Sequence, residues 1–194
     1  MTRPFKIVLA STSSGRRELM QRLGIPFVVI APVGVEEIQV GTPRKVVTRN
    51  ASAKASEVAA GLNEGLVVGA DTVVAIDDTI LGKAESPREA REMLEALRGR
   101  MHRILTGLAV IDVETGRRDV DIVVTKVWIH PVSDDEIWSY VSSGEPRGKA
   151  GGYAIQGAGS ALVERVEGSF ENVVGLPIAQ LRSMLEGFGL EIPS

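Results

Sequence analysis

The residue of this sequence most suited to chemistry is Asp71, which lies inside the apolar run LVVGADTVVAI at residues 66–76. An acid in the middle of a buried strand is costly unless it is paired, bound to a metal or lining a cleft. Gly69 and Ala70, directly before it, would let another backbone or a ligand approach closely. The alternative is an aspartate that makes structural hydrogen bonds at a strand end. Because perturbed carboxylates in clefts often do chemistry, the pattern favours a functional acid.

A second candidate is the segment STSSGRR at residues 11–17, which combines hydroxyls, one glycine and the side chains of Arg16 and Arg17. It lies between an apolar run and the start of a predicted helix. Backbone N–H groups at a helix N-terminus, with guanidinium groups beside them, form a natural anion site. The same residues could equally be a capped helix with two solvated arginines.

Three further positions are weaker when each is taken alone. Asn50 and Lys54 are four residues apart and share one face of a predicted helix, although a lysine there can also be structural filler that reaches solvent. Lys83 is a cation in a loop. Gln156, in the glycine-rich segment KAGGYAIQG at residues 149–157, offers an amide suited to reading a base or sugar edge. That amide could equally tie down its own loop.

Together these residues describe a site for a polyphosphate. The acids Glu37 and Asp71 could hold Mg²⁺ or Mn²⁺ as hard oxygen ligands. The side chains that could neutralise phosphate charge are Arg16, Arg17, Lys54 and Lys83. Phosphoanhydride cleavage needs little else, because charge neutralisation, in-line positioning and an activated water supply most of the rate.

The composition excludes several other kinds of site. The chain has 194 residues and no cysteine, which excludes disulfides, thiolate metal sites and a cysteine nucleophile. With His102 and His130 as its 2 histidines, a zinc site built on histidine is disfavoured. A net charge of −3 argues against bulk binding to nucleic acid or acidic membrane. Neither a signal peptide pattern nor a run of about 20 apolar residues occurs, so we expect a cytoplasmic protein.

The elements that must position these residues alternate between strands and helices. Strands are predicted over residues 6–10, 27–31, 66–76, 80–81, 102–113, 120–129 and 161–166. Helices are predicted over residues 16–23, 42–60, 86–97, 133–141 and 177–188, and those at Ser86 and Ser133 begin with a capping box. The two long strands that meet at residues 114–116 indicate an antiparallel hairpin. We therefore expect one α/β domain over residues 1–194, with helices flanking a mixed sheet.

An ordered set of short motifs resembles the Maf family of nucleoside triphosphate pyrophosphatases. The motifs are LASTSSGRRELMQRLGI at residues 9–25, NASAKA at 50–55, GADT at 69–72, LGK at 81–83, LxGxxH at 97–102, KAGGYAIQG at 149–157 and GSFENVVGLP at 168–177. Any one tetrapeptide is a weak signal, but the set occurs in order and with compatible spacing, which makes it specific.

The resemblance implies a mixed, twisted sheet with two lobes around a central cleft, similar to inosine triphosphatases, and often a homodimer. The implied reaction is attack of a metal-activated water on the α-phosphate of a non-standard or pyrimidine nucleotide, which releases pyrophosphate. The implied cofactor is Mg²⁺ or Mn²⁺. The implied partner is a nucleoside triphosphate substrate, and neither a nucleic acid nor a membrane is expected.

The resemblance also assigns roles to individual residues. Asp71 matches the general base and metal acid of the family, and Glu37 matches its other acid, with the neighbouring Glu36 as a rival. The phosphate-binding set is matched by Ser11, Arg16, Arg17, Lys54 and Lys83. The positions linked to substrate choice are matched by Arg16, Thr72 and Gln156.

The sequence at residues 155–157, Ile-Gln-Gly, resembles the subgroup of dTTP/UTP pyrophosphatases. A sister subgroup that hydrolyses 7-methyl-GTP differs there. The family pattern S-x-S-P-R-R is replaced here by S-T-S-S-G-R-R, Ala84 replaces a proline and Gly148 an aspartate, but the metal acids are intact. We therefore expect hydrolysis of dTTP and UTP. The alternatives are hydrolysis of 7-methyl-GTP and a nucleotide-binding regulator of cell division whose hydrolysis is vestigial.

Overall fold

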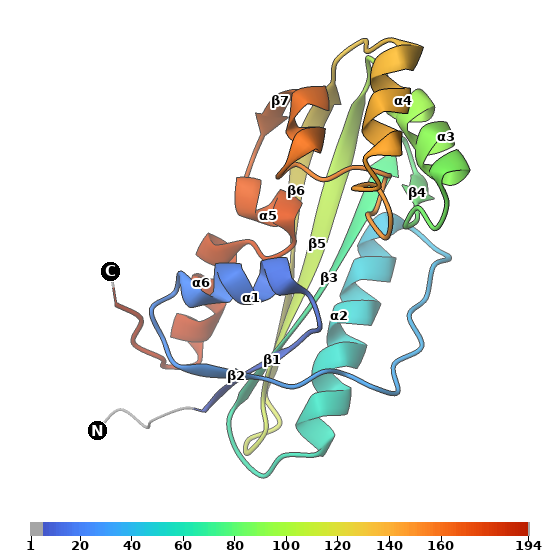
Figure 1. The fold of residues 1–194 in the computed structure, drawn as a ribbon. Coiled ribbons are helices and arrows are strands. Elements are labelled where there is room, and N and C mark those ends of the chain that lie inside the picture. Colours follow the sequence, from blue (N-terminus) through green and yellow to red (C-terminus); the bar gives the residue numbers. More distant parts are fainter. Residues whose placement is uncertain (1–5, 194) are drawn as a thin grey trace. The chain divides into compact units, whose positions relative to one another are not determined.

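The computed structural model describes residues 6–193, and its strands form one mixed sheet (Figure 1). The strands are β1 (Ile7–Ala10), β2 (Phe27–Val29), β3 (Leu66–Ile76), β4 (Thr79–Leu81), β5 (Met101–Asp112), β6 (Arg118–Ile129) and β7 (Val163–Glu167). Their order is β2-β1-β3-β5-β6-β7, and β4 pairs with β3. β1 runs parallel to β2 and β3, whereas β4 is antiparallel to β3 and β7 to β6. The predicted mixed sheet is confirmed.

The helices are α1 (Ser14–Gln21), α2 (Pro43–Ala60), α3 (Pro87–Leu97), α4 (Asp134–Ser142), α5 (Phe170–Val174) and α6 (Ile178–Gly187), with a 3₁₀ helix η1 at Ala158–Leu162. Both α5 and η1 were absent from the prediction, since five residues are too few to show a helical hydrophobic period. Because η1 occupies residues up to Leu162, the last strand starts at Val163 and not at residue 161. None of the helices in the described part of the chain is long and apolar enough to cross a membrane.

The chain divides into two compact units. The first unit consists of the residues up to Thr72, of Thr106–Val123 and of the residues from Gly175 onward. The second unit consists of Val73–Leu105 and Val124–Val174. Each unit has its own buried core, and the two are described in turn.

In the first unit, α2 lies directly against the sheet. Its Ala51, Ala55 and Val58 pack on Val8 and Ala10 of β1, and on buried residues of β3 and β5. Figure 1 shows α2 on one side of these strands and α1 and α6 on the other. Two strand glycines allow the close approach: a Cβ on Gly69 would lie 2.3 Å from the carbonyl oxygen of Ala51, and one on Gly107 would lie 2.5 Å from that of Val47. The helix backbone therefore contacts the strand backbone at these two points.

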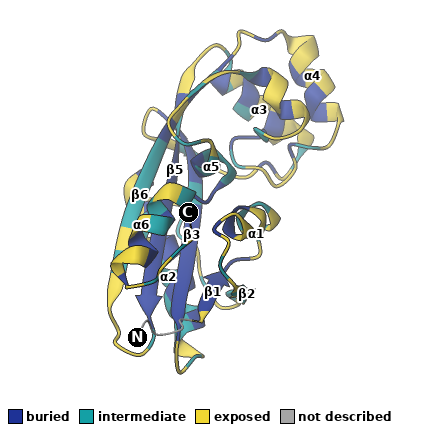
Figure 2. Ribbon diagram, turned by 90° about the vertical axis from the view of Figure 1, so that its left-hand side faces the viewer, coloured by how far each residue is buried: buried dark blue, intermediate teal, exposed yellow. Residues whose placement is uncertain are grey.

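In the second unit, α3 and α4 pack against each other and share one core, which includes Leu94 of α3 and Ile137 of α4. Figure 2 shows the buried residues of both helices in dark blue and their exposed residues in yellow. The predicted capping box at Ser133 is complete. The one at Ser86 is wrong in part: Ser86 accepts from the N–H of Glu89, but the carboxylate of Glu89 accepts from the N–H of Glu85 instead of Ser86.

Candidate active site

The candidate site of the first unit lies just beyond the carboxyl end of β1, beside the middle of β3. The register pairs Ala10 with Gly69, so Ser11 follows β1 close to the point where β3 carries Asp71. Carboxyl ends of parallel strands are where ligands bind in open α/β sheets. The order of the strands thus brings together Ser11 and Asp71, which are 60 residues apart in the sequence.

Asp71 is 6% exposed, and both of its carboxylate oxygens have partners from α2. The ammonium nitrogen of Lys54 lies 2.7 Å from Oδ1, and the amide Nδ2 of Asn50 donates to Oδ2 at 3.0 Å. The two α2 residues lie four positions apart, so both reach the same carboxylate from one helix face. The buried acid is therefore paired and held in one orientation.

Glu37 joins this cluster from the loop before α2. Its Oε1 lies 2.7 Å from the same Lys54 nitrogen, and its side chain is 35% exposed. Asn50 holds the loop in place, since its amide accepts from the N–H of Ile38 at 2.9 Å and donates to the carbonyl of Ile38 at 3.0 Å. Glu36 and Glu37 are both exposed residues, and of the two it is Glu37 that forms the ion pair with Lys54.

Arg16 extends from α1 to a different group of partners. Its Nε donates to the carbonyl of Gly175 at 2.8 Å, and its Nη2 donates to Oγ1 of Thr72 at 2.9 Å. Oγ1 of Thr72 lies 2.9 Å from Oγ1 of Thr106, which is buried. Burial lowers the pKa of Arg16, while the carboxylates of Asp71 and Glu37 act in the opposite direction. An arginine stays charged under such conditions, so the site keeps a fixed cation beside Thr72.

The segment before α1 holds its own hydroxyls in place. Ser11 is buried, and its Oγ accepts from the N–H of Ser13 at 3.1 Å. Ser13 is the N-cap of α1 and accepts from the N–H of Arg16 at 3.3 Å. Arg17 is exposed. Of the two arginines, Arg16 is thus the one that the structure brings to Thr72.

The remaining two predicted residues, Lys83 and Gln156, belong to the second unit. Lys83 is exposed and forms an isolated antiparallel bridge with Ala150, so it lies beside the segment that leads to Gln156. Gln156 is also exposed. Within its own unit, the structure therefore places the predicted loop cation and the predicted base-reading amide on neighbouring segments.

The acids of the first unit fit a divalent cation. Carboxylate oxygens are the ligands that Mg²⁺ and Mn²⁺ prefer, and Asp71 and Glu37 already share one positive charge, that of Lys54. Among the described residues, no group of three or more His, Cys, Asp or Glu side chains could hold a metal by itself. Mg²⁺ commonly binds through one or two carboxylates and completes its shell with water and phosphate oxygens. The donor set therefore suits an ion that completes its shell with water or phosphate oxygens.

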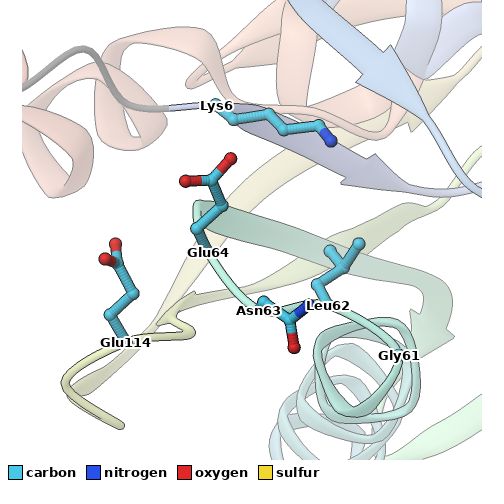
Figure 3. A pocket seen from close by; sticks show the side chains of 6 residues that line it. All are labelled: Lys6, Gly61, Leu62, Asn63, Glu64 and Glu114. Carbon is cyan, nitrogen blue, oxygen red and sulfur yellow. The ribbon is translucent and has the colours of Figure 1, made fainter.

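A separate hollow of about 430 Å³ lies at the other end of the same strands (Figure 3). It is lined by Lys6, Gly61, Leu62, Asn63, Glu64 and Glu114. Lys6 directly precedes β1 and Glu64 stands two residues before β3, whereas Ser11 follows β1 and Asp71 lies at the middle of β3. This hollow contains none of the residues that the sequence singled out.

The fold is shared with the Ham1 protein of Staphylococcus aureus, whose structure aligns with a TM-score of 0.59 over 94% of this chain and 99% of that chain, at 18% sequence identity. The likeness confirms the predicted α/β architecture. The sequence places the chain more narrowly, because a family model described as Maf-like protein matches residues 6–188. The chain belongs to the Maf family, as its motifs predicted.

Curated relatives match along almost the whole chain. A protein of Moorella thermoacetica is 45% identical over 189 residues, covering 96% of this chain and 97% of its own length. A protein of Dictyoglomus thermophilum is 41% identical over 190 residues, covering 96% of this chain and 98% of its own length. Both relatives are named dTTP/UTP pyrophosphatase.

Proposed function

We propose that this protein is a nucleoside triphosphate pyrophosphatase that hydrolyses dTTP and UTP to the monophosphate and pyrophosphate. The family membership and the names of the full-length relatives support the reaction and the substrates. The observation that carries the proposal in the structure is Asp71, a buried carboxylate whose two oxygens are held by Lys54 and Asn50.

Asp71 is the proposed general base. Its fixed orientation lets it accept a proton from a water molecule that attacks the α-phosphate, which requires a positioned acceptor within hydrogen-bond reach. Together with Glu37 it would hold a divalent metal, which supplies charge neutralisation and water activation when bound. Asn50 supports this role because it holds both Asp71 and the loop that carries Glu37.

The cations of the first unit retain donors for phosphate. An ammonium has three N–H groups, and Lys54 directs two of them to Asp71 and Glu37, which leaves one for a phosphate oxygen. The guanidinium of Arg16 has five N–H donors, and its contacts with Gly175 and Thr72 use two. The hydroxyl of Ser11 accepts a hydrogen bond, so its own proton is available to donate.

We extend the proposal to the other residues that the sequence analysis assigns to the site. Arg17 and Lys83 are exposed cations that would bind phosphate oxygens. Thr72, which is oriented by Arg16, and the exposed amide of Gln156 would distinguish between substrates. The homodimer is a prediction that light scattering of the purified protein would test.

The experiment that tests the function is pyrophosphate release with Mg²⁺ or Mn²⁺ from dTTP, UTP, CTP, GTP, 7-methyl-GTP and dITP. We expect dTTP and UTP to be hydrolysed fastest, and Asp71→Asn to lower kcat at least about 100-fold. Asp77→Asn, which changes an exposed acid that pairs with Arg100, is the matched control and keeps its turnover.

Three results would contradict parts of this proposal. A preference for 7-methyl-GTP would overturn the substrate. Tight nucleotide binding without turnover on any substrate would favour the regulator of cell division. Near-normal turnover by Asp71→Asn would overturn the assignment of the base.

A further inference from the structure

A carboxylate outside the predicted site, Glu145, organises the loop of the second unit that carries Gln156. The loop runs from the end of α4 to the start of η1. Oε1 of Glu145 accepts from the backbone N–H of Gly159, and Oε2 accepts from that of Ala158, both at 3.0 Å. One side chain at the start of the loop therefore binds two successive N–H groups at its end.

Tyr140 extends this network to the middle of the loop. Its hydroxyl donates to Oε1 of Glu145 at 3.0 Å and accepts from the N–H of Ala154 at 3.0 Å. The tyrosine belongs to α4, and it is buried in the core of the second unit. The loop is thus anchored to a helix at its start, middle and end, through two side chains.

A second anchor lies directly beside Ala154. The hydroxyl of Tyr153 lies 2.7 Å from Nε2 of His102, and the two rings meet edge to face with centroids 5.5 Å apart. His102 is 1% exposed and Tyr153 is buried. Gln156 is exposed and lies between the fixed backbone at residues 153–154 and the fixed backbone at residues 158–159. Its position therefore depends on these anchors.

The charge of Glu145 suits this role. Burial alone would raise the pKa of Glu145, but the hydrogen bonds from Gly159 and Ala158 outweigh it and hold the pKa below its ordinary value. The ionised carboxylate only accepts hydrogen bonds, which matches its three donors. A glutamine here would turn its NH₂ group toward one of these donors and break the arrangement.

We propose that Glu145 is a positioning residue that sets the conformation of the loop around Gln156, and through it the selection of the nucleotide base. The inference rests on the proposed function, since it concerns which triphosphates that activity accepts. In this proposal Glu145 acts through the loop, by its contacts with Tyr140, Ala158 and Gly159, and not by binding phosphate. The expected signature is a change in KM and in base selectivity with little change in kcat.

The test compares Glu145→Gln with Glu136→Gln, a matched control in the first turn of α4, the helix that precedes the loop. Glu136 accepts from the N–H and the hydroxyl of Ser133, so its replacement also removes helix-associated hydrogen bonds but leaves the loop untouched. For Glu145→Gln we expect KM for dTTP and UTP to rise about tenfold, with kcat within about threefold of the wild type and a smaller preference over CTP. Tyr140→Phe should act in the same direction, which provides a second variant if the first folds poorly.

A readout independent of turnover is limited proteolysis with trypsin. Arg147 and Lys149 are exposed cleavage sites inside the loop. We expect Glu145→Gln to be cleaved after these residues several-fold faster than the wild type and the Glu136→Gln control, and dTTP to slow this cleavage in the wild type.

The outcomes separate the two proposals. If the wild type turns over dTTP but Glu145→Gln matches the control in KM, selectivity and cleavage, the inference is wrong and the function stands. An equal loss of kcat/KM on all nucleotides, together with a lowered melting temperature, would mean that Glu145 has a purely structural role. That result would also overturn the inference. A wild type that releases no pyrophosphate contradicts the proposed function, and unchanged cleavage in the variant would then refute the role of Glu145 in the loop as well.

Discussion

The ammonium nitrogen of Lys54 lies 2.7 Å from Oδ1 of Asp71, and both side chains are 9% exposed. The same nitrogen lies 2.7 Å from Oε1 of Glu37. One cation of α2 therefore compensates two carboxylates, one of which belongs to the centre of β3. Removing one partner of a buried ion pair is costly because it leaves an uncompensated charge. Lys54 thus stabilises the two carboxylates in the folded protein, and its ammonium group competes with any metal ion that would bind them.

Replacing Lys54 should separate its effect on stability from its competition with a metal ion. We expect Lys54→Met to lower the free energy of unfolding by about 3 kcal/mol and kcat at least about 100-fold. In the absence of nucleotide, the variant should bind Mn²⁺ about tenfold more tightly, since the ion no longer competes with the ammonium. Titration followed by electron paramagnetic resonance measures this binding. Lys126→Met, which breaks an exposed pair with Glu167, is the control, and unchanged Mn²⁺ binding by Lys54→Met would contradict the competition.

Even a conservative replacement of Arg16 should lower the activity. A lysine keeps the charge but lacks the planar fork that reaches the carbonyl of Gly175 and the hydroxyl of Thr72 together. We expect Arg16→Lys to lower kcat/KM for dTTP at least about tenfold. Steady-state kinetics checks this, with Arg88→Lys, a change in an exposed helix pair, as the control. Equal kcat/KM values for the two variants would show that the fork is dispensable.

Gly69 should tolerate no side chain. A Cβ at this position would lie 2.3 Å from the carbonyl oxygen of Ala51 and 2.9 Å from the backbone nitrogen of Ala55, and neither atom can move without shifting α2. We expect Gly69→Ala to lower the free energy of unfolding by about 3 kcal/mol, measured by urea denaturation. Gly34→Ala is the control, because nothing lies within 4 Å of the added carbon. A stable Gly69→Ala protein would mean that the helix does not contact the strand this closely.

His102 should make stability depend on pH. Burial lowers its pKa from 6.5 to about 4, and its Nδ1 has no hydrogen-bond partner within the described part of the chain. Between these two values the unfolded chain binds a proton that the folded chain does not. The neutral His102 therefore costs no stability above pH 6.5. As the pH falls from 6.5 toward 4, the free energy of unfolding decreases by about 3 kcal/mol in total.

Thermal unfolding between pH 4 and pH 7 measures this dependence. In His102→Gln the side chain does not titrate, so the curve of stability against pH should be flatter than in the wild type. Carboxylates that titrate near pH 4 contribute equally to both proteins and cancel in the comparison. Parallel curves would show that His102 takes up its proton in the folded state as easily as in the unfolded one.

Much of the architecture followed from local patterns. The bounds of β3 agree with the prediction, and α2 starts one residue later, at Pro43 with Thr42 as its N-cap, because an unbroken apolar run and a threonine–proline start are strong local signals. The family was also predictable and is confirmed, since it rests on motifs that stand in order along the chain. Lys54, Asp71 and Glu37, which the sequence analysis assigns to one site, lie together in the structure, where the Glu37 loop and β3 meet α2.

The long-range contacts of the site could not be predicted from local signals. Arg16 binds the carbonyl of Gly175, a backbone atom 159 residues away that no side-chain pattern marks. The pairing of Thr72 with Thr106 depends on the order of strands in the sheet, which hydrophobic periodicity does not encode. The sequence places Asn50 on the same helix face as Lys54, but its two hydrogen bonds with Ile38 depend on the path of the loop, which no local pattern encodes.

The two glycines under α2 also bear on how this protein can evolve. Where Gly69 and Gly107 meet Ala51 and Val47, backbone touches backbone, so the spacing does not depend on side-chain shape. Ordinary apolar positions elsewhere in the core are then free to drift toward other side chains of similar volume, since volume-conserving exchanges cost little. The separation of the backbones that carry Lys54 and Asp71 would survive such drift as long as both glycines are kept, because backbone atoms meet there. Selection on the candidate active site would in this way be separated from selection on the side chains that fill the core.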